Sequence, residues 1–276
     1  MMRSARIELR LKGPILNMCE LFGVSSPEKI QLTSLLSEFF SHGDHHPDGW
    51  GMAFFSGNEV SLEKQPVNSK KSPYLRERLK GAIESDSMIA HIRLATKGFV
   101  EYENTHPFVQ KDVRGRNWTL AHNGTIFDSE LLNPMFYVQS GHTDSERILC
   151  YFIKEINTLY QQIPCKEELS AEDRFRLADR IICSITKGNK VNLLLFDGEL
   201  LYVHTNYRSS LYCRKEQTGI LFSTKPLDLK DWKPVPMTTL LAFRRGKLVF
   251  KGTDHGHEYF DSASKTKHLY LDYAIL

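Results

Sequence analysis

Cysteine is scarce in this chain of 276 residues, and its spacing excludes two kinds of cross-linked small domain. There are five cysteines, an odd number, and no two of them form a C-x-x-C pair. A disulfide framework and a zinc ribbon both need paired cysteines at short spacings, so we expect neither. Unpaired thiols are typical of a reducing compartment, and we predict a cytoplasmic protein.

The sequence also lacks long apolar runs and a strong net charge. No stretch reaches the length of a membrane span, and residues 1–17 are charged where a signal peptide would have an apolar core. The formal charge is +3 at pH 7, with basic and acidic residues interspersed. A chain this close to neutrality has no general attraction for nucleic acid or an anionic membrane surface, so we predict neither as a partner.

The residues that are present predict a mixture of helices and short strands. Three segments, beginning at Ser26, Thr143 and Ser170, have apolar residues at helical spacing after a capping residue. The first of them, over 26–41, starts with Ser-Pro-Glu, and Thr143 opens a capping box. Short strand-like runs with turn residues, including an Asp197-Gly198 hairpin signal, favour an α+β fold with antiparallel sheets. These runs cover 19–24, 50–55, 87–95, 117–122, 191–196, 200–205, 219–224, 238–243 and 247–251.

The stretch HGDHHPDGWG (42–51) holds the densest set of potential metal ligands. A metal-dependent hydrolase is one alternative, because zinc needs three or four converging ligands. Adjacent histidines on an extended chain would point to opposite sides, however, and the interleaved glycines and proline are typical of a turn. A polar loop is the favoured interpretation, and we predict no metal and no cofactor. The ligands considered are His42, Asp44, His45, His46 and Asp48.

Other polar positions each have a structural interpretation when they are taken singly. His91 and Arg93 share one face of a predicted strand, where an internal ion pair would satisfy a buried arginine. Asn123-Gly124 is a turn signal, and the helix dipole favours Asp144 at the start of a capped helix. Cys19 alone is a core thiol, since a reactive thiol would need a lowered pKa or an adjacent base.

Taken together and in order, these segments resemble the glutaminase domain of class II glutamine amidotransferases, which are N-terminal-nucleophile hydrolases. The resemblance begins at MCELFG (18–23) and continues through DGWGMAFF, AHIRLAT, ENTHPF, GRNWTLAHNG and HTDSE. It is strong over residues 18–160 and looser afterwards, and the stand-alone YafJ-like group is the most similar. The implied fold is a four-layer αββα sandwich of two antiparallel sheets.

The resemblance implies catalytic roles for three residues. Cys19 would attack the γ-amide of glutamine or of another γ-glutamyl compound, giving a thioester and releasing ammonia or an amine. Its own α-amine, with a pKa near ~8, would serve as general base. The side-chain amide of Asn123 and the backbone N–H of Gly124 would form the oxyanion hole.

Further residues would bind the amino-acid end of the substrate. Arg93, helped by Thr96, offers a fork of donors to the α-carboxylate, and Asp144 offers a carboxylate to the α-ammonium. By position in the family motifs, His106, Trp50 and Gly51 would lie near the glutamine pocket, whereas His91 and His122 would be structural.

The residues ahead of Cys19 conflict with this mechanism, because an α-amine exists only at the end of a chain. We therefore expect residues 1–18 to be a leader, or a mis-set start, that is absent from the active form. A single glutamine amidotransferase domain would occupy 19–276. If translation starts at Met18, cysteine is small enough for the methionine before it to be removed.

No synthase or phosphoribosyltransferase segment is recognisable after the glutaminase region. The leading prediction is therefore a stand-alone amidohydrolase with a small-molecule substrate. The alternative is a glutamine-binding or ammonia-supplying subunit of a separate, ammonia-accepting partner enzyme.

Overall fold

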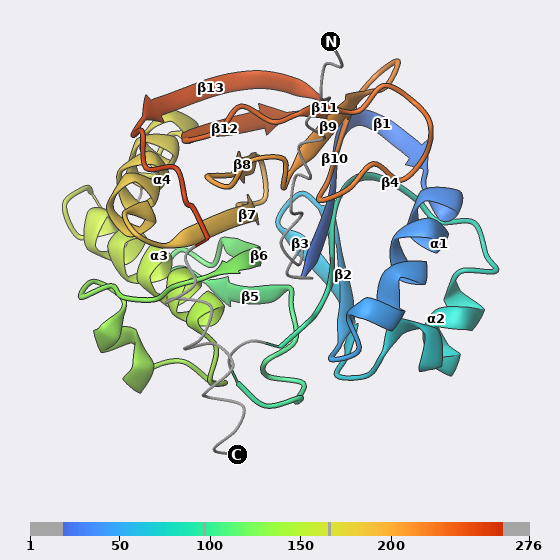
Figure 1. Ribbon diagram of the computed structural model, residues 1–276. Coiled ribbons are helices and arrows are strands. Elements are labelled where there is room, and N and C mark those ends of the chain that lie inside the picture. The colour runs from blue at the N-terminus through green and yellow to red at the C-terminus, as the bar shows by residue number, and fades with distance from the viewer. Residues whose placement is uncertain (1–18, 96–97, 165–166, 262–276) are drawn as a thin grey trace, which may run out of the picture.

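Two antiparallel β-sheets form the centre of the computed structural model, which describes residues 19–95, 98–164 and 167–261 (Figure 1). Sheet A has the strand order β11-β9-β10-β1-β4-β2-β3, and sheet B has the order β13-β12-β8-β7-β6-β5. The strands are β1 (Glu20–Gln31), β2 (Trp50–Ser56), β3 (Glu59–Gln65), β4 (Glu84–Ile92), β5 (Phe108–Lys111), β6 (Asn117–Thr125), β7 (Lys190–Phe196), β8 (Leu201–His204), β9 (Tyr212–Lys215), β10 (Ile220–Ser223), β11 (Lys233–Pro234), β12 (Thr239–Arg244) and β13 (Lys247–Asp254). The α-helices are α1 (Thr33–Ser41), α2 (Pro73–Arg78), α3 (Asp144–Tyr160) and α4 (Ala171–Thr186), and the 3₁₀ helices are η1 (His42–His45), η2 (Ser69–Lys71) and η3 (Asn133–Tyr137).

Three apolar cores separate four layers. Helices α1 and α2 pack on the outer face of sheet A, and α3 and α4 pack on the outer face of sheet B. The third core lies between the two sheets. Figure 1 shows the two helix pairs on opposite sides of the strands. The predicted αββα sandwich of two antiparallel sheets is therefore confirmed.

Strand alternation decides which side chains reach the space between the sheets. In β1, Leu21 belongs to the core between the sheets and Phe22 to the core under α1. Cys19, two residues before Leu21, therefore lies at one end of the inner face. In β6, Ala121 belongs to the inner core, so Asn123 follows it on the same face.

The first helix begins later than the sequence predicts. We expected a helix over 26–41, but β1 continues to Gln31 and α1 starts at Thr33. Ser26 does accept a hydrogen bond, from the backbone N–H of Glu28 at 3.2 Å, but as a local turn. This turn lies within a bulge, after which Ile30 pairs with Ser85 of β4. Pairing with a distant strand overrides the local helix signal here.

The other predicted helix starts and the hairpin are confirmed. Thr143 caps α3 by accepting from the N–H of Glu146 at 3.1 Å, and Ser170 caps α4 by accepting from Asp173 at 3.1 Å. The Asp197-Gly198 turn joins β7 to β8, with Gly198 at a φ of 88°. Among the described residues, no helix is both long and apolar enough to cross a membrane.

Candidate active site around Cys19

The Cys19 thiol is held against the backbone that follows β4. Its Sγ donates to the carbonyl oxygen of Leu94 at 3.2 Å and accepts from the N–H of Leu94 at 3.3 Å. Burial raises the pKa of this thiol to about 11, although the Leu94 hydrogen bond and the Arg93 charge oppose the rise. Asp48 raises the pKa further. The thiol is therefore protonated near neutrality, and it needs a base to become a nucleophile.

Arg93 is buried next to this thiol, one residue before Leu94. Its Nη1 donates to the carbonyl of Phe99 at 2.9 Å and its Nη2 to that of Gly98 at 3.1 Å. Asp48 fixes the same turn, because its Oδ2 accepts from the N–H of Ala95 at 2.7 Å. The guanidinium thus holds the loop at Gly98 and Phe99, and its charge acts on Cys19. Thr96, the predicted helper of Arg93, lies outside the described residues.

Two stacked histidines join the sheets beside this turn. His91 of β4 and His106 stack with ring centroids 4.1 Å apart, and the Nε2 of His91 lies 3.3 Å from the carbonyl of His122 in β6. Burial lowers the pKa of both His91 and His106 well below the ordinary value, so both rings are neutral. A Cβ at Gly51 would lie 2.2 Å from the backbone oxygen of His106, so only glycine fits there.

The side chain of Trp50 faces away from this cluster. Its indole is fully buried in the core under α1 and α2, near Phe40 at 5.8 Å and Tyr74 at 6.1 Å between ring centroids. Of the predicted Trp50-Gly51 pair, Gly51 alone adjoins His106, because successive residues of a strand face opposite sides.

Asn123 and Gly124 lie at the end of β6, beside β7. Asn123 is 2% exposed, and its Oδ1 has no hydrogen-bond partner in the described part of the chain. A Cβ at Gly124 would lie only 2.0 Å from the backbone oxygen of Lys190. Glycine therefore lets the two strands approach closely beside an amide that is buried and incompletely bonded.

Asp144 approaches the same strand end from α3. It is the first residue of the helix, 4% exposed, and its Oδ2 accepts from the N–H of Ile126 at 2.7 Å. This bond fixes the carboxylate just beyond Asn123-Gly124 and at a helix N-terminus, where a negative charge is favoured. The structure therefore gathers Cys19, Arg93, His106, Asn123-Gly124 and Asp144 around one end of the two sheets.

Sequence reasoning missed a buried amine at this end of β7. Lys190 is 4% exposed, and its Nζ lies 3.7 Å from the ring centroid of Tyr207. Burial lowers the pKa of Lys190 to about 8, while the carboxylate of Asp261, and Cys19 when its sulfur is ionised, favour the charged form of Lys190. The alternating polar residues Lys190 and Asn192 at the start of β7 were the available signal, because they share one face of the strand.

The polar loop over 42–51 distributes its side chains among different partners. His42 Nδ1 lies 2.7 Å from the buried carboxylate of Glu20, Asp44 pairs with Lys70 at 2.5 Å, and His46 Nδ1 bonds to the carbonyl of His42 at 2.9 Å. His45 is exposed. Across 19–95, 98–164 and 167–261, no three His, Cys, Asp or Glu residues gather as metal ligands. The loop supports Glu20, whose side chain lies on the opposite face of β1 from Cys19.

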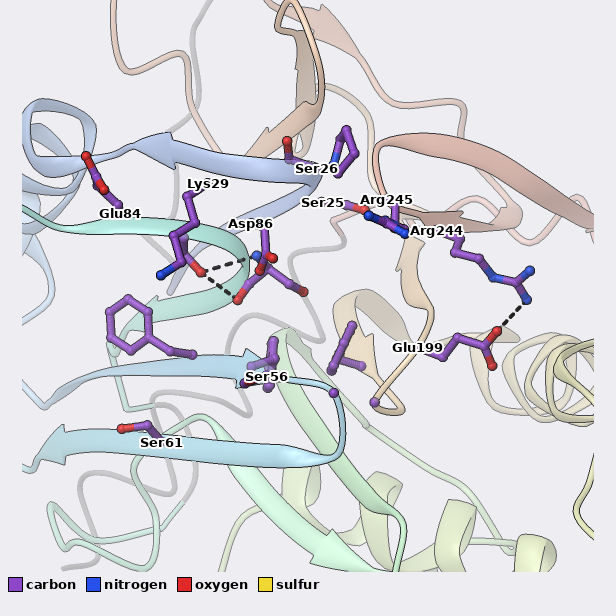
Figure 2. A pocket seen from close by; sticks show the side chains of 18 of the residues that line it. Ser25, Ser26, Lys29, Ser56, Ser61, Glu84, Asp86, Glu199, Arg244 and Arg245 are labelled. Carbon is purple, nitrogen blue, oxygen red and sulfur yellow. Dashed lines mark hydrogen bonds and ion pairs between the residues drawn. The ribbon is translucent and has the colours of Figure 1, made fainter.

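A cavity of about 800 Å³ lies at the other end of the sandwich (Figure 2). Ser25 lines it and pairs with Ser87, whereas Glu20 pairs with Ile92, so the cavity begins roughly 20 Å along the chain from Cys19. Four basic side chains line it together with four acidic ones, and Arg244 pairs with Glu199 at 2.7 Å. A lining with balanced charge and no nucleophile next to a base does not resemble an active site.

Comparisons with known proteins identify the family and the fold type. A family model described as "Glutamine amidotransferases class-II" matches residues 18–219. The putative glutamine amidotransferase YafJ of Escherichia coli is 35% identical over 207 residues, which are 74% of this chain and 79% of that protein. The crystal structure of a predicted glutamine amidotransferase from Pseudomonas aeruginosa superposes with a TM-score of 0.61 at 25% identity, over 84% of this chain and 100% of that one. Glutamine phosphoribosylpyrophosphate amidotransferase of Bacillus subtilis shares the fold, with a TM-score of 0.59 at 15% identity over 84% of this chain and 48% of that one. The sandwich is thus the N-terminal-nucleophile type that these amidotransferases have in common.

Proposed function

We propose, from the premise that this chain belongs to the class II glutamine amidotransferases, that it is a Cys-dependent amidohydrolase for glutamine or another γ-glutamyl amide. The observation that carries the proposal is the placement of Cys19 beside Arg93, at the end of the sandwich where Asn123-Gly124 and Asp144 also lie. A nucleophile, oxyanion donors and a pair of opposite charges are the parts that acyl transfer from an amino-acid side chain requires.

In the proposed site, Arg93 and Asp144 form a clamp that binds the amino-acid end of the substrate. Arg93 has five N–H donors in a planar fork that matches the geometry of a carboxylate, and two of these donors hold the loop at Gly98 and Phe99. One oxygen of Asp144 is engaged by Ile126, which leaves the other for an α-ammonium. The two charges would fix the γ-carbonyl over the sulfur of Cys19. Because the clamp contacts only the γ-glutamyl head, glutamine and other γ-glutamyl amides would all fit it.

The proposed reaction forms a C–S bond and breaks a C–N bond. The sulfur of Cys19 attacks the γ-carbonyl carbon, and its proton passes to the α-amine of the same residue. The Asn123 amide and the Gly124 N–H would stabilise the oxyanion, at about 3 kcal/mol for each donor. The α-ammonium then gives its proton to the leaving nitrogen, and water hydrolyses the thioester to glutamate.

The raised pKa of Cys19 supports an amine base. A thiol with a pKa of about 11 loses its proton at neutral pH only if a base accepts that proton during the attack. The α-amine is the base proposed, and it is free only when Cys19 is the first residue. Residues 1–18, the proposed leader or mis-set start, lie outside the described residues.

The test compares three proteins in an assay of glutamate release from glutamine. Protein that begins at Cys19 should be active, protein with residues 1–18 attached should be inactive until they are removed, and Cys19→Ala should be inactive in both forms. Cys213→Ala is a matched control, because Cys213 is another half-buried thiol and lies on β9, away from the site. Equal activity of Cys19→Ala and the wild type would overturn the proposal.

A further inference from the structure

A second buried asparagine faces Asn123 across the β6–β7 pair. Asn123 of β6 stands directly opposite Asn192 of β7, two residues beyond the pair formed by Ala121 and Leu194. Ala121 and Leu194 both belong to the core between the sheets, so both asparagines point to the same inner face. Directly opposite side chains on an antiparallel pair have Cβ atoms about 5 Å apart. The two amides are therefore neighbours.

The orientation of the Asn192 amide is fixed by two donors. The hydroxyl of Thr205 donates to Asn192 Oδ1 at 2.6 Å, and the backbone N–H of Asn206 donates to the same oxygen at 3.3 Å. A backbone N–H can only donate, so the atom that faces it must be the amide oxygen. The Nδ2 of Asn192, which is itself a hydrogen-bond donor, therefore points away from Thr205 and from the N–H of Asn206.

The unsatisfied atoms of the two asparagines are complementary. Within the described residues, Asn192 Nδ2 is buried with no acceptor, and Asn123 Oδ1 is buried with no donor. Asn192 is fully buried and Asn123 is 2% exposed, so bulk water does not reach either side chain freely. A small side-chain rotation that joins the two atoms would satisfy both, and buried polar groups are usually paired.

We propose that Asn192 is a positioning residue, whose Nδ2 donates to Asn123 Oδ1 and so directs the Asn123 amide nitrogen toward the substrate oxyanion. Without this contact, the described residues offer the Asn123 Oδ1 no donor that would decide which end of the amide faces the substrate. The inference rests on the proposed function, because the oxyanion hole is part of that proposal. Asn192 does not touch the reacting atoms itself; it acts through Asn123.

The first test is a double-mutant cycle in steady-state glutamine hydrolysis. Asn192→Asp keeps an acceptor for Thr205 and Asn206 but puts a second acceptor opposite Asn123, so the Asn123 amide should turn its nitrogen toward Asp. We expect kcat to fall about 100-fold, the loss typical of one oxyanion donor, with KM changed less than about threefold. In an Asn123→Ala background the same substitution should lower kcat by less than about threefold. Equal losses in the two backgrounds would overturn the proposal.

The matched control makes the same substitution at the other end of β6. Asn117 is also buried, and its Nδ2 donates to the backbone oxygen of Asn58 at 2.6 Å. Asn117→Asp should lower the unfolding midpoint and leave kcat unchanged. If Asn192→Asp does not fold, Asn192→Ala removes the donor without adding an acceptor. It should lower kcat about tenfold, again with little further loss when it is combined with Asn123→Ala.

A second readout separates this inference from the proposed function. Urea unfolding of Asn123→Ala, Asn192→Ala and the double variant tests the contact without any substrate. We expect the stability losses of the single variants to be less than additive, because each removes the same hydrogen bond. Additive losses would overturn the pairing even in an active enzyme. A wild type that hydrolyses no γ-glutamyl compound, but shows non-additive losses, would overturn the proposed function and leave the pairing intact.

Discussion

The two ends of the sandwich differ in how their polar groups are satisfied. At the cavity end, two ion pairs between partly exposed side chains line the cavity, Arg244 with Glu199 and Arg78 with Glu63. At the Cys19 end, polar atoms are buried and several have no partner among the described residues, including Asn123 Oδ1, Asn192 Nδ2 and both ring nitrogens of His106. Each such atom costs about 1–3 kcal/mol. We therefore expect the chemistry at the Cys19 end, whose polar groups are buried in spite of this cost in stability. We do not expect it at the end that holds the cavity.

The largest difference that we predict between the two ends follows from replacing one glycine by alanine at each end, which adds one methyl group. In Gly124→Ala the new Cβ would lie 2.0 Å from the Lys190 oxygen, so β6 and β7 must separate. We expect stability to fall by about 3 kcal/mol and activity to fall at least about 100-fold. Gly57→Ala at the cavity end meets no atom within 4 Å and has only its φ of 57° to accommodate. It should cost about 1 kcal/mol and leave activity unchanged. Urea unfolding measures the loss of stability, and glutamate release measures the loss of activity. Wild-type activity of Gly124→Ala would contradict the predicted difference between the two ends.

The next effect concerns the two arginines at opposite ends. Arg93→Lys keeps the charge but loses the fork of donors, so we expect KM for glutamine to rise about 10- to 100-fold with a smaller change in kcat. Arg78→Lys replaces an arginine that lines the cavity, where Nε lies 3.3 Å from Glu63, and should change neither constant. Initial-rate kinetics of glutamine hydrolysis measure kcat and KM for both variants. A normal KM in Arg93→Lys would remove Arg93 from the proposed clamp.

A smaller predicted effect is the pH dependence of stability that two buried lysines cause. Burial lowers the pKa of both Lys190 and Lys64 to about 8, from an ordinary value of 10.5. Between these values the unfolded chain binds more protons than the folded one, so each lysine makes the free energy of unfolding rise with pH from about 8 to 10.5. Each buried lysine therefore costs up to about 3 kcal/mol of stability below pH 8, and this cost disappears as the pH rises to about 10.5. Replacing either lysine by methionine should flatten the rise relative to wild type in urea unfolding at several pH values.

Alkylation of Cys19 then distinguishes the two lysines. The thiolate form of Cys19 interacts with the charge of Lys190, whereas Glu146 and Glu103 are the charges that act on Lys64. Lys190→Met should therefore slow iodoacetamide labelling of Cys19 at pH 7, by about tenfold for each unit that the thiol pKa rises. Lys64→Met should leave the labelling rate unchanged. Equal rates in all three proteins would show that Lys190 does not influence the sulfur.

The smallest effect is expected at the exposed ion pair of the cavity. The side chains of Arg244 and Glu199 are 39% and 38% exposed, and their charges are 2.7 Å apart. Arg244→Met should change the free energy of unfolding by less than about 1 kcal/mol and leave glutamine hydrolysis unchanged. A large loss of activity would give the cavity a role that its balanced charges do not suggest.

Local signals predicted the elements whose stabilising contacts are close in sequence. The caps of α3 and α4 are three-residue contacts, so Thr143 and Ser170 could be identified as helix starts from sequence. The start of α1 could not, because the pairing of Ile30 with Ser85 joins segments far apart in the chain. Strands β3, β5, β9 and β11 were also missed, since such short or partly exposed strands have weak alternation.

The candidate site divides in the same way. Cys19, Arg93, Asn123-Gly124 and Asp144 belong to motifs that could be recognised along the chain. Lys190 and Asn192 lie more than 60 residues after Asn123, and only the β6–β7 register makes them its neighbours. The direction of the Trp50 indole likewise depends on which face of β2 the helices α1 and α2 cover. Motifs therefore predict which residues take part in a site, whereas strand register decides which side chains meet.

The central claim is that Cys19 carries a γ-glutamyl thioester, and trapping this intermediate tests it most directly. Protein that begins at Cys19 is mixed with glutamine, quenched in acid and digested, and the peptides are weighed. The account predicts a γ-glutamyl adduct on the peptide of Cys19, none on the peptides of the other cysteines, and γ-glutamyl hydroxamate when hydroxylamine is present. Full glutamine hydrolysis with no adduct on Cys19, and undiminished in Cys19→Ala, would contradict it.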